Sequence, residues 1–375
     1  MAQLRDFAME RWQSRFENQV TYNLSESGVH PVTVRELLEL AELDTLADVR
    51  IGYGQSNGTP ELRARIAALY AGAETEHIVV TNGSAEANFA VLWHLVEPGD
   101  DVVILMPAYM QASGLVESLG ARIREVWLRE AEGWQPRVED IEAAVTERTR
   151  IIIVTNPNNP TGVALTDAAR HALLHAAERV GAWILADEVY TGAEIGGVET
   201  PTFWQPDRRV IATGSLSKAY GLPGLRIGWA VLPRSLSEPV WARKDYTTIG
   251  PGALTDQLAF LALDARVRPR LLARTRRYIE TGLELLTDWL TRMKVFQYRR
   301  PDAGAILFAH YDLPVTADDL VERLRTRHSL LIVPGTHFHM DSYLRFGFGL
   351  PAPELARALA EFETCIRSLA VAAPT

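Results

Sequence analysis

The stretch Gly214-Ser215-Leu216-Ser217-Lys218-Ala219-Tyr220-Gly221-Leu222-Pro223-Gly224-Leu225-Arg226 lies between two apolar runs, 210–212 and 227–232. These runs resemble buried strands, so the stretch is expected to be the loop that joins them. Its lysine is either an ordinary solvated side chain or a group kept inside the fold. Burial would lower its pKa, and a neutral amine is the nucleophile that forms Schiff bases with carbonyl compounds. Lys218 is therefore a candidate catalytic residue, and its neighbours must decide between the two interpretations.

Apolar strand-like runs alternate with helical patterns on both sides of this loop. The predicted strands are 78–80, 102–106, 122–128, 151–154, 182–186, 210–213, 227–232, 305–310, 330–333 and 343–348. The predicted helices are 33–47, 60–71, a segment that ends near 96, 109–119, 166–180, 251–265, 268–292, 316–327 and 352–371. Continuous apolar strands between helices are typical of an α/β fold with a mainly parallel sheet, covered on both faces. The loops at the carboxyl ends of such strands carry the functional site.

The pattern becomes looser beyond about residue 235, which indicates a second unit. We predict a large domain over 48–265 and a smaller α+β domain made of 1–47 and 266–375. Residues 1–20 carry Phe7, Met9, Trp12 and Phe16 among polar residues, so they are expected to form a helix or arm that packs on the remainder.

Composition limits the class of protein. The 375 residues are 47% hydrophobic and 23% charged, as in average globular proteins. The net charge of -9 argues against a nucleic-acid or anionic-membrane partner. A single cysteine, Cys365, excludes an internal disulfide and fits a reducing compartment. We find no run long enough to span a membrane and no signal peptide, so a cytoplasmic location is expected.

Three further loops place polar residues at predicted strand ends. Gly83-Ser84-Ala85 opens a helix directly after a strand, where free N–H groups favour an anion such as phosphate. Asn159 lies in a proline-rich loop whose turns do not themselves require this asparagine. Asp187 and Tyr190 follow the apolar strand 182–186, and a carboxylate there is costly unless it meets a positive partner.

Together these loops resemble the class I and II aminotransferases, which are pyridoxal-phosphate (PLP) enzymes of fold type I. Asn159-Pro160-Thr161-Gly162 matches the Asn-Pro-x-Gly motif of that family, and 187–190 matches its Asp-x-x-Tyr motif. Ser215-Leu216-Ser217-Lys218, followed eight residues later by Arg226, matches its lysine segment. The spacings of 28 residues from Asn159 to Asp187 and 31 from there to Lys218 follow the family's order. The resemblance covers almost the whole chain.

The resemblance implies PLP as the cofactor and a role for each of these residues. Lys218 would bind PLP as a Schiff base and move the proton at the substrate Cα. Asp187 would pair with the protonated ring nitrogen, and Asn159 and Tyr190 would hydrogen-bond the ring oxygen. Tyr109 would stack on the ring. The phosphate would be bound by Gly83, Ser84, Ala85, Ser215, Ser217 and Arg226, together with Tyr53 of a neighbouring subunit.

The resemblance also implies where an amino acid would bind. Arg345 would hold the α-carboxylate, beside Gly28 and Asn159. The role of Tyr53 implies a homodimer that shares its active sites. We interpret His337 and His339 as the rim of the pocket rather than a metal site, because two ligands alone do not make one.

Transamination between an L-amino acid and a 2-oxo acid, by a ping-pong mechanism, is the implied function. However, the segments 25–30 and 244–246 depart from ordinary aminotransferases. Together with residues 215–229 they are similar to capreomycidine synthase, a relative that cyclises a hydroxylated arginine through β-elimination. That reaction would need an acid for the guanidinium, and Glu26 is the candidate. A PLP-dependent β-lyase would share every motif, because the fold does not fix which bond to Cα breaks.

Two other classes are disfavoured, and one substrate class has no support. Acyl-CoA-condensing relatives usually stack a histidine where Tyr109 stands. A transcription regulator with an aminotransferase-like sensor would need a DNA-binding domain, whereas the motifs begin near residue 25 and the chain is acidic. No second arginine can be assigned to a side-chain carboxylate, so specificity for a dicarboxylate is not supported.

Overall fold

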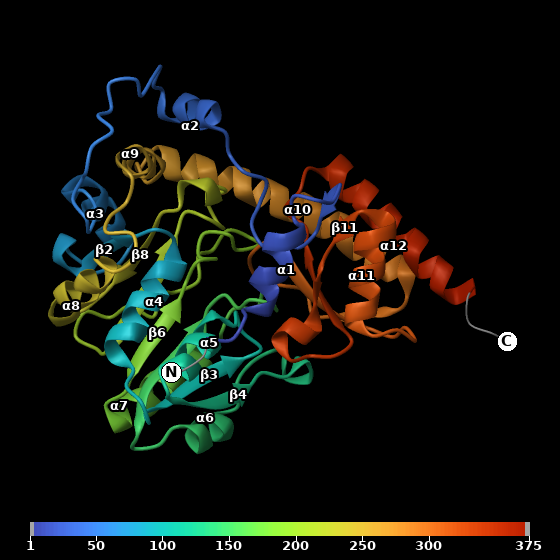
Figure 1. Cartoon of the computed structure of the whole chain (residues 1–375), viewed down its shortest axis with the longest axis horizontal. Coiled ribbons are helices and arrows are strands. Elements are labelled where there is room, and N and C mark those ends of the chain that lie inside the picture. The colour runs from blue at the N-terminus through green and yellow to red at the C-terminus, as the bar shows by residue number, and fades with distance from the viewer. Residues whose placement is uncertain (1–3, 372–375) are drawn as a thin grey trace.

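The computed structural model describes residues 4–371, and its main sheet has seven strands in the order β2-β8-β7-β6-β5-β3-β4 (Figure 1). These strands are β2 (Ile78–Thr81), β3 (Asp101–Met106), β4 (Arg122–Trp127), β5 (Thr149–Thr155), β6 (Trp183–Asp187), β7 (Val210–Ser215) and β8 (Gly228–Val231). β8 runs antiparallel to β2 and β7, and the other neighbouring pairs are parallel. The predicted α/β fold with a mainly parallel sheet is confirmed.

Helices cover both faces of this sheet. Successive side chains of a strand point to opposite faces. Val103 and Leu105 of β3 therefore pack on the side of α6 (Val138–Ala144) and α7 (Asp167–Val180). Ile104 packs on the other side, with α4 (Ser84–Leu95), α5 (Gln111–Ser118) and α8 (Arg234–Lys244). Burial on both faces explains why these strands read as continuous apolar runs.

The last third of the chain forms a second, antiparallel sheet in the order β12-β13-β10-β9. Its strands are β9 (Phe296–Tyr298), β10 (Ile306–Tyr311), β12 (Val333–Pro334) and β13 (Tyr343–Gly347), with α11 (Ala317–His328) and α12 (Ala352–Val371) beside them. The N-terminal segment meets this region, because β1 (Tyr22–Asn23) pairs in parallel with β11 (Leu330–Leu331) (Figure 1). The predicted domain division stays a prediction, and this pairing is consistent with it.

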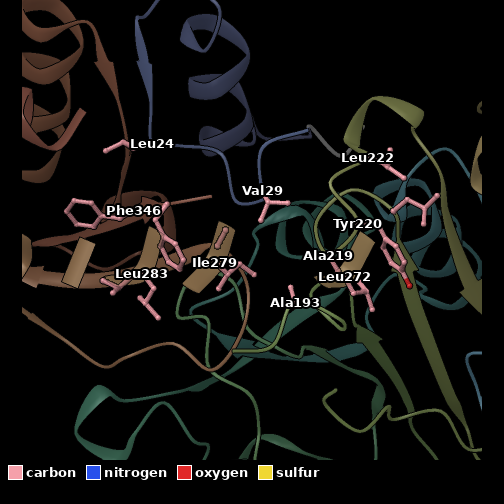
Figure 2. Close-up of a cluster of buried hydrophobic side chains, with 14 of the residues drawn as sticks. Leu24, Val29, Ala193, Ala219, Tyr220, Leu222, Leu272, Ile279, Leu283 and Phe346 are labelled. Atoms are coloured by element: carbon pink, nitrogen blue, oxygen red, sulfur yellow. The ribbon is translucent and has the colours of Figure 1, made fainter. Parts of the chain in front are cut away.

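A shared apolar cluster connects the two sheets through the long helix α10 (Val267–Met293), which follows α9 (Ala253–Ala262). Figure 2 shows Ile279 and Leu283 of α10 with Val29 of the N-terminal segment and with Ala219, which follows Lys218 in the chain. The Thr275 hydroxyl donates to the Ala219 carbonyl at 2.7 Å. The lysine loop is thus fixed against α10. Within residues 4–371, every helix is too short or too polar to span a bilayer.

Several predicted boundaries are wrong. The helix expected over 33–47 is α2 (Val34–Ala41), which ends because Glu42 adopts a left-handed conformation with φ 56. The helix expected over 60–71 is α3 (Pro60–Ala67). The sequence analysis missed the helices α6 and α8 and the strand β9. It missed α8 because this helix is largely polar and contains Pro239, a residue that usually ends a helix. Residues 1–20 do contain a helix, α1 (Ala8–Phe16), whose Met9 is buried.

Candidate active site

A cavity of about 340 Å³ opens where three neighbouring parallel strands end. Thr155, Asp187 and Ser215 are the last residues of β5, β6 and β7, and all three line it. This position is the one that an open parallel sheet offers to a ligand. The predicted site residues that line the cavity are Ser84, Ala85, Tyr109, Asn159, Asp187, Tyr190, Ser215, Ser217, Lys218, Arg226 and Arg345.

The remaining predicted residues do not line the cavity. Gly83 immediately precedes Ser84 at the start of α4. Gly28 lies beside Lys218, because a Cβ on Gly28 would be 3.6 Å from Lys218 Cδ. Its N–H donates to Glu26 Oε1 at 2.9 Å, so its contact with a substrate carboxylate stays a prediction. Tyr53 is fully exposed on the loop between α2 and α3.

The sequence suggested that His337 and His339 form the rim of the pocket, but neither residue lies there. His337 packs edge-on against Trp12, with ring centroids 6.4 Å apart, and neither His337 nor His339 lines the cavity. Across the described range 4–371, no group of three or more His, Cys, Asp or Glu side chains is arranged to bind a metal.

Lys218 forms an ion pair with Glu26. Its Nζ donates to Glu26 Oε1 at 2.8 Å, and the same oxygen accepts the Ser27 and Gly28 N–H groups. Burial, the largest single effect, lowers the pKa of Lys218, but the charge of Glu26, the charge of Tyr190 and the hydrogen bond to Glu26 together raise the net pKa. The pKa of Glu26 falls to about 2, chiefly because of the Lys218 charge. The expectation that burial alone leaves this lysine neutral is therefore wrong. The amine is held as a cation, and Glu26 orients it.

Asp187 is a buried carboxylate whose direct partners are neutral. Its side chain is hydrogen-bonded by Asn88 Nδ2 at 2.9 Å and by the Val189 N–H at 3.3 Å, and only 7% of the residue is exposed. Burial raises the pKa of Asp187 to about 6. Among residues 4–371 no cationic side chain lies within ion-pair distance of it. A buried carboxylate of this kind is stabilised by a cation that a ligand brings.

Asn88 was missed by the sequence analysis. It lies one turn into α4, and its Oδ1 accepts the Thr213 hydroxyl at 2.9 Å while its amide donates to Asp187. This orients the carboxylate. The available signal was helical spacing, since Asn88 shares the buried side of α4 with Val91 and Leu92.

The start of α4 forms a narrow cradle. Gly83 has φ 78, and a Cβ there would lie 2.4 Å from Nη2 of Arg226. A Cβ on Gly228 would lie 2.3 Å from the backbone nitrogen of Ser84. Two glycines therefore allow the strand β8 and the Arg226 guanidinium to approach the first N–H groups of α4. Helix N–H groups and a guanidinium together suit a phosphate group.

Arg345, on β13, is 1% exposed and has no carboxylate partner within residues 4–371. Its Nη1 donates to Asn159 Oδ1 at 2.9 Å, and its Nη2 donates to the Ser25 carbonyl at 2.5 Å. Its Nε has no partner in the described structure. A buried guanidinium without a carboxylate carries a desolvation cost that a carboxylate ligand would offset.

The helix α1 contributes a wall that the sequence did not predict. Glu10, Gln13, Ser14 and Glu17 line the cavity beside the expected residues. Tyr109 reaches this wall, because its hydroxyl donates to Glu10 Oε1 at 2.9 Å. The only signal was the mixed polar and apolar pattern of residues 1–20.

The chain belongs to the aminotransferase class I and II family, whose family model matches residues 22–362. Capreomycidine synthase of Streptomyces vinaceus is 35% identical over 371 residues, which cover 96% of this chain and 92% of that relative. The arginine–pyruvate transaminase of Pseudomonas aeruginosa is 28% identical over 88% of this chain and 86% of its own.

Solved structures agree with this family. A PLP-dependent aminotransferase from Streptococcus suis superposes with a TM-score of 0.92 and 32% identity, over 98% of this chain and 99% of its own. The PLP-dependent cyclase OrfR superposes with a TM-score of 0.89 and 26% identity, over 98% of both chains.

The cofactor of this chain is PLP, and the residues of the cavity fit it. The glycine cradle at the start of α4 and Arg226 fit the phosphate. Asp187, a buried carboxylate with neutral partners, fits a protonated ring nitrogen. Lys218 supplies the amine that a cofactor aldehyde requires.

Proposed function

We propose that this protein is an aminotransferase that moves an amino group between an L-amino acid and a 2-oxo acid by a ping-pong mechanism. One observation carries the proposal: Lys218, Asp187 and Arg345 line a single cavity and supply an amine, a buried carboxylate and a free guanidinium edge. These groups match the aldehyde, the ring nitrogen and the substrate carboxylate that transamination brings together.

Arg345 would position the substrate. Its Nη1 already donates to Asn159, which fixes the plane of the guanidinium. The unpartnered Nε is available to a carboxylate oxygen, and a charge-assisted pair of this kind sets both position and orientation. The substrate Cα is then directed toward the Lys218 side of the cavity.

Lys218 would transfer the proton at the substrate Cα, with Glu26 beside it. PLP, when bound, supplies an electron sink for the negative charge that develops at the substrate Cα. The Lys218 Nζ would take the Cα proton and return it, which is general acid–base catalysis by a positioned amine. Glu26 Oε1, at 2.8 Å, would orient the Lys218 Nζ, and its charge favours the protonated amine that returns the proton. Asp187, oriented by Asn88, would hold the ring-nitrogen proton.

The proposal is tested first by covalent trapping. We expect the purified protein to be yellow and, after reduction with borohydride, to carry the mass of reduced PLP on the peptide that contains Lys218. The Lys218→Ala variant should lose the label and the visible absorbance band. A colourless protein that does not bind added PLP would contradict the proposal. Amino transfer itself is checked by the appearance of a new amino acid from an added 2-oxo acid.

A second candidate is a cyclase or β-eliminating lyase of the capreomycidine synthase type, acting on an arginine-derived amino acid. It is favoured by the 35% identity to capreomycidine synthase over nearly the whole chain. The fold does not choose between these reactions, because it does not fix which bond to Cα breaks. Product formation without any 2-oxo acid acceptor would favour this candidate over transamination.

We also propose a homodimer with shared active sites. Tyr53 is fully exposed and Ile51 is 90% exposed on the same loop, which supports its covering by a second subunit. The proposal predicts that two inactive variants, Lys218→Ala and Tyr53→Ala, regain activity when they are mixed and reassembled. A cytoplasmic location, which the single cysteine supports, would be checked by cell fractionation.

A further inference from the structure

The cavity has more carboxylates than the cofactor and the substrate backbone can use. Besides Asp187, it is lined by Glu10, Glu17 and Glu26. The cationic residues on its wall are Lys218, Arg226 and Arg345. In the proposed function, Arg226 faces the phosphate, Arg345 faces the α-carboxylate and Asp187 faces the ring nitrogen. Lys218, which would hold PLP, pairs directly with Glu26, so no cationic side chain among the residues that line the cavity remains for Glu10 and Glu17.

Glu10 and Glu17 are presented by one fixed helical face. They are seven residues apart, with Gln13 and Ser14 between them on the same side of α1 and its C-cap. The helix is anchored by Gln13 Nε2, which donates to the Ser25 carbonyl at 2.8 Å, and by Trp12 Nε1, which donates to the Ile332 carbonyl at 3.0 Å. The backbone that carries Glu10 and Glu17 is therefore fixed beside the cavity.

The three glutamates differ in what they bind. Glu26 Oε1 accepts from Lys218 and from two backbone N–H groups. Glu10 Oε1 accepts from Tyr109, and this contact fixes the carboxylate beside the expected ring position. The Glu17 carboxylate has no hydrogen-bond or ion-pair partner within residues 4–371. Burial, followed by the charges of Glu26 and Glu10, raises the pKa of Glu17, so an added cation would relieve this repulsion.

A separate observation indicates that a carboxylate ligand binds in the same cavity. Arg345 is buried, lines the cavity and leaves its Nε unpartnered, which suits a carboxylate at that end. We propose that Glu17 and Glu10 bind the cationic side-chain end of the substrate, a guanidinium or an ammonium group. The inference rests on the proposed function, because it requires an amino acid held by Arg345.

The negative charges of Glu10 and Glu17 disfavour amino acids whose side chain carries a carboxylate. A second carboxylate on the side chain would meet Glu10 and Glu17, and like charges in a partly desolvated site repel strongly. A neutral substrate side chain would leave the negative charges of Glu10 and Glu17 without a positive partner. A guanidinium would give each carboxylate a charge-assisted, planar donor pair.

The test compares L-arginine with L-citrulline, which has nearly the same shape but carries no side-chain charge. Binding to the PLP-loaded protein is measured by calorimetry and by the change in the visible absorbance band. We expect arginine to bind at least about 10-fold more tightly, equivalent to about 1.4 kcal/mol. Glu17→Gln should bring this ratio close to one, and Glu10→Gln should reduce it. Glu142→Gln, an exposed glutamate on α6, is the matched control and should preserve the ratio.

The outcomes separate this inference from the proposed function. If L-alanine or L-glutamate reacts while arginine and citrulline bind equally, the inference is overturned and the proposed function stands. If no amino acid binds or reacts, both fail. Glu17→Gln must lower arginine affinity without changing L-alanine affinity; an equal loss for both would assign Glu17 a structural role and overturn the inference.

Discussion

Replacing Asp187 by asparagine should stabilise the cofactor-free protein at alkaline pH while weakening cofactor binding. The carboxylate is 7% exposed, and burial raises its pKa from 3.8 to about 6. Its proposed role requires a negative charge, whereas its direct partners in the protein, Asn88 and the Val189 N–H, are neutral. A buried carboxylate without a positive partner destabilises the folded protein, and the protonated ring nitrogen of the cofactor would remove this cost.

The magnitude follows from the pKa. A folded-state pKa about two pH units above the unfolded value corresponds to about 3 kcal/mol at 1.36 kcal/mol per unit. Because the pKa is raised, the cost is absent below about pH 3.8, grows as the pH rises and is complete above about pH 6. An asparagine still accepts from Asn88 but loses the Val189 N–H bond, which costs about 1 kcal/mol. The net gain at about pH 8 is therefore about 2 kcal/mol.

Thermal and urea unfolding of the cofactor-free protein at about pH 4.5 and about pH 8 measure this difference. We expect Asp187→Asn to gain stability over the parent protein only at the higher pH. Added PLP should then stabilise the parent protein more than the variant. Asp207→Asn, on an exposed turn, is the control and should show neither effect. A stability difference that does not change with pH would refute the reasoning about Asp187.

Three other changes have expected outcomes. Arg345→Lys should raise the KM for the amino acid and lower kcat/KM by roughly 30-fold, because a lysine cannot pair bidentately with a carboxylate; steady-state kinetics measure this. Gly83→Ala should weaken PLP binding by about 10-fold or more, because the added Cβ would displace the Arg226 guanidinium. Gly114→Ala is the control: its Cβ meets open space, so PLP binding should not change. Fluorescence titration with PLP measures both variants. Lys244→Met should lower the melting temperature, because the fully buried Nζ donates to two backbone carbonyls; calorimetry measures this.

Some of the residues that line the cavity could be predicted because they lie at the end of an apolar strand. Asp187 and Ser215 end β6 and β7, and the parallel register brings these ends together without further information. Gly83 could be predicted because a helix begins immediately after it. These rules predict where a ligand binds, whereas the role of each residue toward PLP was implied by the resemblance to the family to which the chain belongs.

The protonation state of Lys218 could not be predicted, because it depends on a contact between residues 192 positions apart. Burial lowers the pKa of Lys218, but Glu26 at 2.8 Å and Tyr190 together raise the net pKa. The role of Asn88 depends similarly on a partner 99 positions away. No local pattern encodes either pair.

The placement of α1 explains why the sequence indicated the cofactor more clearly than the substrate. The sheet brings its strand ends together by a rule common to all such folds, so the cofactor residues follow from the fold. Glu10 and Glu17 reach the cavity only because α1 packs across it through Trp12 and Gln13. That packing depends on this chain's own N-terminal residues, and a different helix there would keep the cofactor site while changing the charge beside it. If the arginine preference follows Glu17 while PLP binding does not, the two properties are separable in this molecule.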